Sequence, residues 1–233
     1  MAVTMRSITD AMRLLQFGDS VLPVGSVSFS NGLEAAVQQR VVHDVASLRP
    51  FVDAALHQAA TSDGIALLEA HRAASAGEIA RIVRADRAVF ERKLNEEMRT
   101  MTLRMGRKLA EMTAHVAPSP LVAEWLARIE RSGTPGTFPI GMALVFEARK
   151  LAETDAFAAH QYGIATMMLS TALRLMKLNY LDAQAILDEL NAGTDEMYCR
   201  VANATLDDMA AFAPIADILA AVHVKSHVRM FMN

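Results

Sequence analysis

One segment, residues 156–178, restricts most strongly the folds that this chain can adopt. Its section from Ile164 to Leu173 contains no charged side chain and is apolar on almost every side of a helix. A helix that is apolar all round must be buried, in a protein core or in a bilayer. A membrane span needs about 18 or more consecutive apolar residues, and His160 and Arg174 bound a shorter run. We therefore expect a central core helix, the most buried one of the fold, and no membrane span.

The rest of the chain also repeats its apolar residues at helical intervals. Between residues 78 and 115 they recur every three or four positions, at Leu94, Met98, Met101, Met105, Leu109 and Met112. We expect these methionines to pack in the core rather than to bind a soft metal. Hydrophobic residues make up 52% of the sequence but aromatic ones only 6%, which is typical of all-α proteins. Ser47 is expected to cap one helix, and the triplet 61–63 to start another.

We expect a single all-α domain that spans residues 1–233, a helical bundle of about ten helices. Residues 132–137 are the best candidate for a linker, because they combine Ser, Gly, Thr and Pro. The apolar segments on both sides need a shared core, so we interpret this stretch as a loop within the domain. Residues 1–8 and the tail 223–233 are expected to be flexible.

The charge, the cysteine content and the first residues indicate which partners and which cell compartment to expect. The formal net charge is −3, so the chain has no overall basic character for nucleic acid. Basic residues between 81 and 108 alternate with acidic ones, as in the pair Lys93/Glu97, and indicate a solvated helix face. The single cysteine, Cys199, excludes an internal disulfide, and residues 1–9 lack the apolar part of a signal peptide. We expect a cytoplasmic protein.

The N-terminal stretch 14–37 has the features of an ordered loop between two helices. Pro23 fixes the backbone angle φ, and Gly25 permits a positive φ. Ser30 or Asn31 can cap the helix that follows. An ordered loop of this kind gives up conformational freedom that surface connections normally keep, which favours a role in binding.

No intact catalytic or metal-binding motif is present. The sequence lacks the GxxxxGK, GxGxxG, HExxH, CxxC and GxSxG patterns. Among the seven histidines only His223 and His227 are four residues apart, and we interpret them as surface residues rather than as a metal site. We therefore expect no catalytic residue, no metal and no tightly bound cofactor, in a protein that works through interactions.

Four pieces of the N-terminal stretch resemble the signature of the UreF family of urease accessory proteins. They are Leu14-Leu15-Gln16, Leu22-Pro23-Val24-Gly25, Ser28-Phe29-Ser30 and Gly32-Leu33-Glu34. Weaker similarities follow at residues 104–107 and 214–218, and in the tail, where His223, Arg229 and Phe231 match the family ending in kind. Lys177 and Asn179 stand where the family has a proline and a glycine. The resemblance spans nearly the whole chain.

The resemblance implies a UreF-like fold and a function in urease maturation. A UreF protein would form a homodimer, bind the accessory protein UreD/UreH, recruit the GTPase UreG and join apo-urease. The complex would handle nickel and assist its GTP-dependent insertion, while the protein itself would be no enzyme. The partner-binding residues that the resemblance implies are Pro23, Gly25, Ser28, Phe29, Ser30, Gly32 and Glu34 in the N-terminal loop, with Arg174, His223, Arg229 and Phe231 further along the chain.

Two other interpretations remain open from the sequence. One is a helical enzyme with a dispersed active site of His57, Asp63 and His71, which interrupt otherwise apolar helices. The N-terminal loop would then be a substrate lid. The weaker interpretation is a nucleic-acid regulator that uses the basic residues between 81 and 108.

Overall fold

The computed structural model describes residues 7–19, 22–25, 29–211, 218–219 and 230–231. This part of the chain is all-α, without any β-strand, and confirms the predicted fold class. Of the residues predicted to bind partners, Ser28, His223 and Arg229 lie outside the described residues. No helix within the described ranges is both long enough and apolar enough to cross a membrane.

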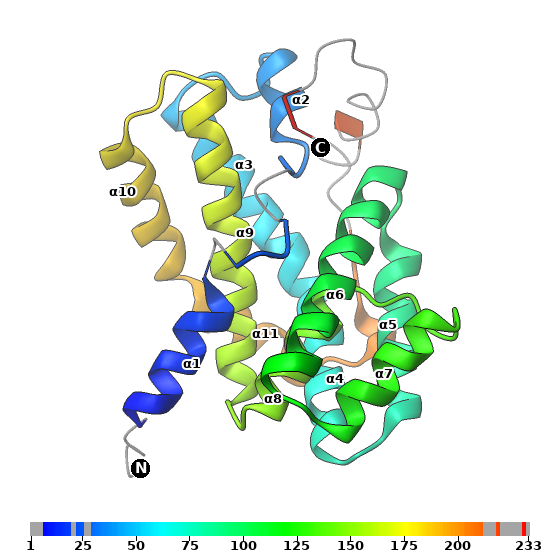
Figure 1. The fold of residues 1–233 in the computed structure, drawn as a ribbon. Coiled ribbons are helices and arrows are strands. Elements are labelled where there is room, and N and C mark those ends of the chain that lie inside the picture. Colours follow the sequence, from blue (N-terminus) through cyan, green and yellow to red (C-terminus); the bar gives the residue numbers. More distant parts are fainter. Residues whose placement is uncertain (1–6, 20–21, 26–28, 212–217, 220–229, 232–233) are drawn as a thin grey trace.

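Figure 1 shows the arrangement of the helices. Those of the first half are α1 (Ile8–Gly18), α2 (Leu33–Gln38), α3 (Val45–Ala59), a π-helical turn η2 (Ala60–Gly64), α4 (Ile65–Ser75) and α5 (Ile79–Arg92). Those of the second half are α6 (Glu96–Val116), α7 (Pro120–Glu130), α8 (Phe138–Ala148), α9 (Glu153–Leu175), α10 (Tyr180–Asn191), α11 (Thr194–Val201) and a 3₁₀ turn η3 (Leu206–Asp208). Helices α1 and α10 both lie against α9, while α7 lies on the other side of the bundle, against α6 and α8.

The most completely buried helix is α8, which corrects the expectation that residues 156–178 would hold this place. All residues from Pro139 to Phe146 are buried, and α8 packs against α4, α6 and α9. Helix α9 packs one face against α3, α4 and α8. On its other face Tyr162 is 42% exposed and Leu173 is 41% exposed. The lack of charge along α9 therefore reflects an uncharged outer face as well as a buried inner one.

Three helix boundaries differ from the local sequence pattern. The triplet 61–63 starts no new helix, because the turn η2 carries α3 directly into α4. The stretch between residues 78 and 115, which has one continuous helical pattern, forms two helices, α5 and α6. Asn95 caps α6 by accepting a hydrogen bond from the Met98 N–H at 2.8 Å. Helix α3 is capped by Asp44 rather than by Ser47, which instead completes a reciprocal capping box.

The carboxylate of Asp86 fastens the loop 132–137 to α5. Its Oδ2 accepts hydrogen bonds from the Thr134 hydroxyl at 2.6 Å and the Gly136 N–H at 2.8 Å. Its Oδ1 accepts from the Thr137 N–H at 2.8 Å and the Thr137 hydroxyl at 2.6 Å. Asp86 is 0% exposed, and a carboxylate so buried is tolerated only when donors replace its water. This stretch is therefore a fixed loop that sets where α8 begins.

Gly106 on α6 lies where this loop comes very close to a helix. A Cβ at this position would lie 2.0 Å from the carbonyl oxygen of Gly136 and 2.6 Å from the carbonyl carbon of Thr137. We expect Gly106→Ala to lower the free energy of unfolding by about 1–3 kcal/mol, because backbone atoms must move to admit the methyl group. Urea denaturation followed by circular dichroism measures this loss.

Gly163 on α9 supplies the matched control for this substitution. A Cβ there would have no atom of the described residues within 4 Å. Gly163→Ala should raise the free energy of unfolding by about 0.5–1 kcal/mol, because alanine favours a helix interior. A Gly106→Ala protein as stable as the wild type would contradict the close packing of α6 against the loop.

Candidate functional site

The N-terminal loop adopts backbone conformations that need glycine, as the sequence predicts. Gly25 has a φ of 91°, which confirms the expected positive angle, and Pro23 is exposed in the same turn. The N-cap of α2 is Gly32, with a φ of 81°, in place of the expected Ser30 or Asn31. A left-handed conformation at this position suits a residue without a Cβ.

The same loop is fastened to α9. Phe29 is only 3% exposed, and its carbonyl oxygen lies 3.5 Å from the Thr171 hydroxyl, which donates to it. The Asn31 amide nitrogen lies 3.8 Å from the Met168 sulfur, which accepts from it. These contacts place residues 29–31 of the loop against α9.

Glu34, on the first turn of α2, binds the tail. Its side chain is buried at 2% exposure. Oε1 accepts a hydrogen bond from the Met230 N–H at 2.7 Å, and Oε2 accepts one from the Phe231 N–H at 3.0 Å. Two N–H donors on one carboxylate form charge-assisted hydrogen bonds, which are stronger than those between neutral groups. The Glu34 carboxylate therefore holds the backbone of the tail against the N-terminal region.

Arg174, at the end of α9, reaches the same part of the tail. Its guanidinium carbon lies 5.9 Å from the centroid of the Phe231 ring, in a cation–π contact. Phe231 is 6% exposed. We call Glu34, Arg174, Met230 and Phe231 the tail seat. The sequence pattern indicates Glu34, Arg174 and Phe231 separately, and only the structure brings these three together.

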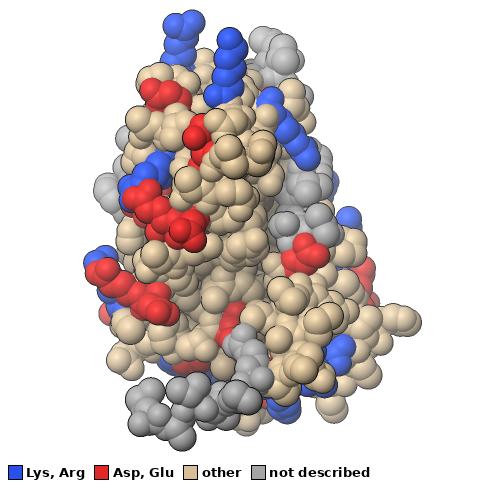
Figure 2. Space-filling view, turned by 90° about the vertical axis from the view of Figure 1, so that its left-hand side faces the viewer, with Lys and Arg blue, Asp and Glu red and all other residues tan. Residues whose placement is uncertain are grey.

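A broad surface with little charge lies on the face that carries α1, α9 and α10 (Figure 2). Both α1 and α10 pack against α9, so their outer sides form one face. Large apolar side chains are exposed on these three helices, namely Ile8, Met12 and Leu15 on α1, Tyr162 and Leu173 on α9, and Tyr180 and Leu181 on α10. Exposed apolar side chains that lie together are typical of protein contact sites.

The three residues of the dispersed enzyme site each have a different partner. His57 is half-exposed and lies 3.7 Å from Asp53 on the same helix. His71 is buried, and its Nε2 lies 3.0 Å from the Leu151 carbonyl oxygen. Asp63 binds neither of these histidines and forms an ion pair with Lys93 instead. The structure thus does not assemble His57, Asp63 and His71 into one site.

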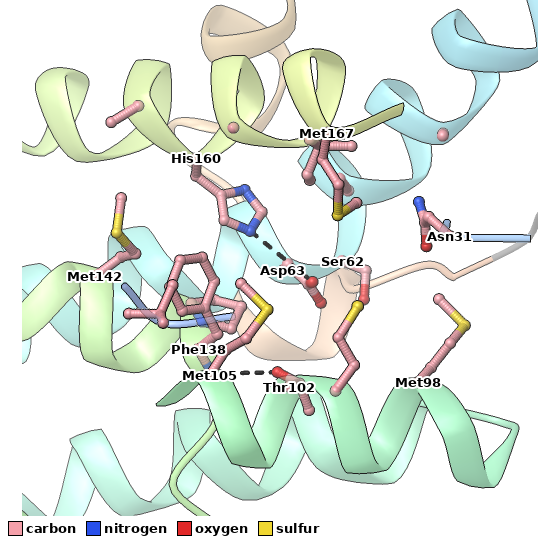
Figure 3. Close-up of a pocket in the computed structure, with 18 of the residues that line it drawn as sticks. Asn31, Ser62, Asp63, Met98, Thr102, Met105, Phe138, Met142, His160 and Met167 are labelled. Atoms are coloured by element: carbon pink, nitrogen blue, oxygen red, sulfur yellow. Dashed lines mark hydrogen bonds and ion pairs between the residues drawn. The ribbon is translucent and has the colours of Figure 1, made fainter. Parts of the chain in front are cut away.

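The group that Asp63 joins was not predicted from the sequence. Lys93 donates to both of its carboxylate oxygens, at 2.7 and 2.8 Å, in place of the expected pair with Glu97. His160 lies beside them, with Nε2 4.0 Å from Asp63 Oδ2 (Figure 3). Burial lowers the pKa of His160 to about 4; the Asp63 charge opposes this shift and the Lys93 charge adds to it. No local spacing links residues 63, 93 and 160, so no sequence signal could have paired them.

The described residues contain no group of three or more His, Cys, Asp or Glu side chains that could hold a metal ion. The pair His223 and His227 falls in the tail, outside the described residues. The arrangement at the tail seat can hold a peptide segment through hydrogen bonds and a ring contact. It brings together no nucleophile and no paired acid and base of the kind that catalysis uses.

The sequence is similar to urease accessory proteins over nearly its whole length. A family model, UreF, matches residues 42–191. The urease accessory protein UreF 2 of Brucella canis is 55% identical over 228 residues, which cover 98% of this chain and 94% of that protein. UreF 1 of Brucella melitensis is 54% identical, with coverage of 98% and 95%. The urease accessory protein UreF of Yersinia pseudotuberculosis is 50% identical, with coverage of 97% and 99%.

The tail seat predicts a local effect of replacing Glu34. Glu34→Ala removes both acceptors of the Met230 and Phe231 N–H groups, so these amides should exchange with solvent at least about tenfold faster. Glu34→Gln keeps one carbonyl oxygen and should give an intermediate rate. Hydrogen exchange of the C-terminal peptide, measured by mass spectrometry, reports both changes. Glu189→Ala, which removes a half-exposed glutamate paired with Arg49, is the matched control and should leave the rate unchanged.

If the C-terminal peptide of Glu34→Ala exchanges at the wild-type rate, the tail does not depend on this carboxylate. Equal exchange rates in Glu34→Ala and Glu189→Ala would lead to the same conclusion, because the two substitutions remove the same kind of side chain.

The lowered pKa of His160 predicts how stability changes with pH. An unfolded histidine takes up a proton near pH 6.5, whereas the folded one does so only near pH 4. The contribution of neutral His160 to the free energy of unfolding is therefore fully present above about pH 6.5 and is lost as the pH falls towards 4. The loss is about 2–3 kcal/mol at pH 4.5. His160→Gln should lose that much less between pH 7 and pH 4.5 in urea denaturation.

His43→Gln is the control for the pH experiment, because His43 has a side chain that is 62% exposed. It should lose as much stability as the wild type between pH 7 and pH 4.5. An identical pH dependence in His160→Gln and in the wild type would mean that His160 does not stay neutral in the folded protein.

Proposed function

Because this chain belongs to the UreF family of urease accessory proteins, we propose that it is a non-catalytic assembly factor in urease maturation. It binds the accessory protein UreD/UreH and the GTPase UreG, and the complex joins apo-urease. The complex then assists the GTP-dependent insertion of nickel, which is its cargo and not a resident cofactor of this chain. The protein works in the cytoplasm as a homodimer.

The observation that carries this proposal is the tail seat. The N-terminal loop and the tail are the two segments expected to contact partners, and Glu34 joins them through two backbone hydrogen bonds. A partner that contacts the N-terminal loop is therefore also close to the tail. We propose that UreD/UreH binds the loop and the tail together and buries apolar area of both segments.

Arg174 links this surface to the rest of the molecule. It stands at the end of α9 with its guanidinium over Phe231, so a change in the tail alters the surroundings of an exposed positive charge. We propose that this charge contacts UreG, which would make the binding of the two partners dependent on each other.

The exposed apolar side chains of α1, α9 and α10 support the homodimer. A two-fold interface buries the same patch on both copies, so each charge near the axis faces its own copy. A face with little charge avoids that repulsion and supplies apolar area to bury.

Co-purification with cognate UreD/UreH and UreG tests the proposal. A complex of defined size should form and should activate apo-urease in the presence of nickel and GTP. Activation should fail when this chain is left out. No association with either partner, or full activation without this chain, would contradict the proposed function.

Two variants test the tail seat within that experiment. Deletion of residues 223–233 should abolish UreD/UreH binding while the helical circular dichroism signal stays unchanged. Arg174→Ala should weaken UreG recruitment by about tenfold or more, as expected for the loss of a charged contact at an interface. Arg131→Ala removes another exposed arginine, just after the end of α7, with 68% side-chain exposure, and should bind as the wild type does.

The assignment of the tail would be wrong if the deleted protein still bound UreD/UreH. The role of Arg174 would be wrong if Arg174→Ala and Arg131→Ala recruited UreG equally well.

A further inference from the structure

Three exposed cations without a carboxylate partner lie around the tail seat. Arg174 is in the last turn of α9, and Lys177 lies just beyond the end of that helix. Arg40 lies just beyond the end of α2. All three residues are exposed, and none of them forms an ion pair with any residue that the structure describes. We call Arg40, Arg174 and Lys177 the cationic rim.

The tail seat brings the ends of α2 and α9 to the same part of the molecule. Glu34 on α2 and Arg174 on α9 both contact Phe231, and α2 packs against α9. Both α2 and the end of α9 lie at the top of Figure 1. Figure 2 keeps the same vertical axis and shows Lys and Arg side chains that project from that end.

The connection between α9 and α10 directs Lys177 away from the core. Met176 and Leu178 on either side of it are partly buried against the core, and the Leu178 N–H donates to the Met176 carbonyl oxygen at 2.9 Å. Asn179 then caps α10 by accepting a hydrogen bond from the Asp182 N–H at 2.8 Å. Its φ is −89°, so this position does not need the glycine of the family pattern. The two departures from that pattern therefore keep an ordered turn and add a positive charge.

The lack of carboxylate partners distinguishes the cationic rim from other exposed cations of the protein. Several of these form ion pairs, namely Arg49 with Glu189, Arg107 with Glu111 and Arg200 with Glu196. The dipoles of α2 and α9 favour positive charge at their C-terminal ends, but this does not neutralise the side chains. Neighbouring like charges repel each other, so carboxylates supplied by another molecule would be attracted to the cationic rim.

An acidic protein surface fits the cationic rim better than a nucleic acid does. Proteins that bind DNA through its backbone contact about six to ten phosphates, whereas the cationic rim has only Arg40, Arg174 and Lys177. The chain as a whole has a formal net charge of −3, which repels a long polyanion. A protein with a few carboxylates in one patch avoids this repulsion, because it approaches only one end of the molecule.

We propose that the cationic rim attracts and binds an acidic patch of the GTPase UreG, with Arg40 and Lys177 acting beside Arg174. This inference rests on the proposed recruitment of UreG and adds the chemistry of the contact and two further residues. Charges at the edge of an interface act mainly on the association rate, because they attract the partner before it makes contact. Lys177 and Arg40 therefore accelerate recruitment more than they slow dissociation.

Surface plasmon resonance tests the proposal with the complex of this chain and cognate UreD/UreH immobilised and UreG in solution. The association rate constant of the wild type should fall about tenfold between about 50 mM and 500 mM NaCl, because salt screens the attraction. Lys177→Glu and Arg40→Glu should each lower this rate constant about fivefold at low salt. Lys177→Arg keeps the charge and should associate as the wild type does.

Arg84→Glu is the matched control, because it reverses the charge of an exposed arginine on α5. It changes the net charge by the same amount as Lys177→Glu and should leave the association rate unchanged. All of these variants replace exposed side chains, so their melting temperatures should stay within about 2 °C of the wild type.

The outcomes separate this inference from the proposed function. If UreG binds the wild-type complex but associates equally fast with Lys177→Glu and Arg84→Glu, the cationic rim is wrong and the recruitment of UreG stands. A wild-type association rate that does not change with salt would also overturn the cationic rim alone. Absence of UreG binding to the wild-type complex would overturn both the cationic rim and the proposed function.

Discussion

The buried carboxylate of Asp86 makes one conformation of the loop before α8 far more stable than any other. Four donors from Thr134, Gly136 and Thr137 converge on its two oxygens. Without them the charge would stand unpaired in the interior, at a cost of several kcal/mol. The loop conformation fixes where α8 starts, and α8 is buried among α4, α6 and α9. The positions of the helices around the core thus depend on this one set of hydrogen bonds.

Helix α9 connects the core to the surface that is expected to contact partners. His160 near its start lies in the core, beside Asp63. Farther along, Met168 and Thr171 hold the N-terminal loop, and Arg174 covers Phe231 of the tail. Because these contacts lie along one rigid helix, the loop and the tail are set in register with the core.

The N-terminal loop takes part in two features of the molecule. Asn31 contacts Met168 on α9, and Glu34, on the first turn of α2, holds the tail. Because these two residues are near neighbours in the chain, one short segment connects the tail to α9.

The sequence by itself determined the helical fold class, most helix positions, the glycine-dependent turn at Gly25 and the family resemblance, because these follow from residue types at short spacing. It also indicated Glu34, Arg174 and Phe231 one by one. Only the tertiary structure decided that these three meet, that Lys93 pairs with Asp63 instead of Glu97, and that α8 rather than α9 is the most buried helix. The physical reason is range: helix periodicity acts over a few residues, whereas a buried charge takes its partner from whichever distant segment the packing brings beside it.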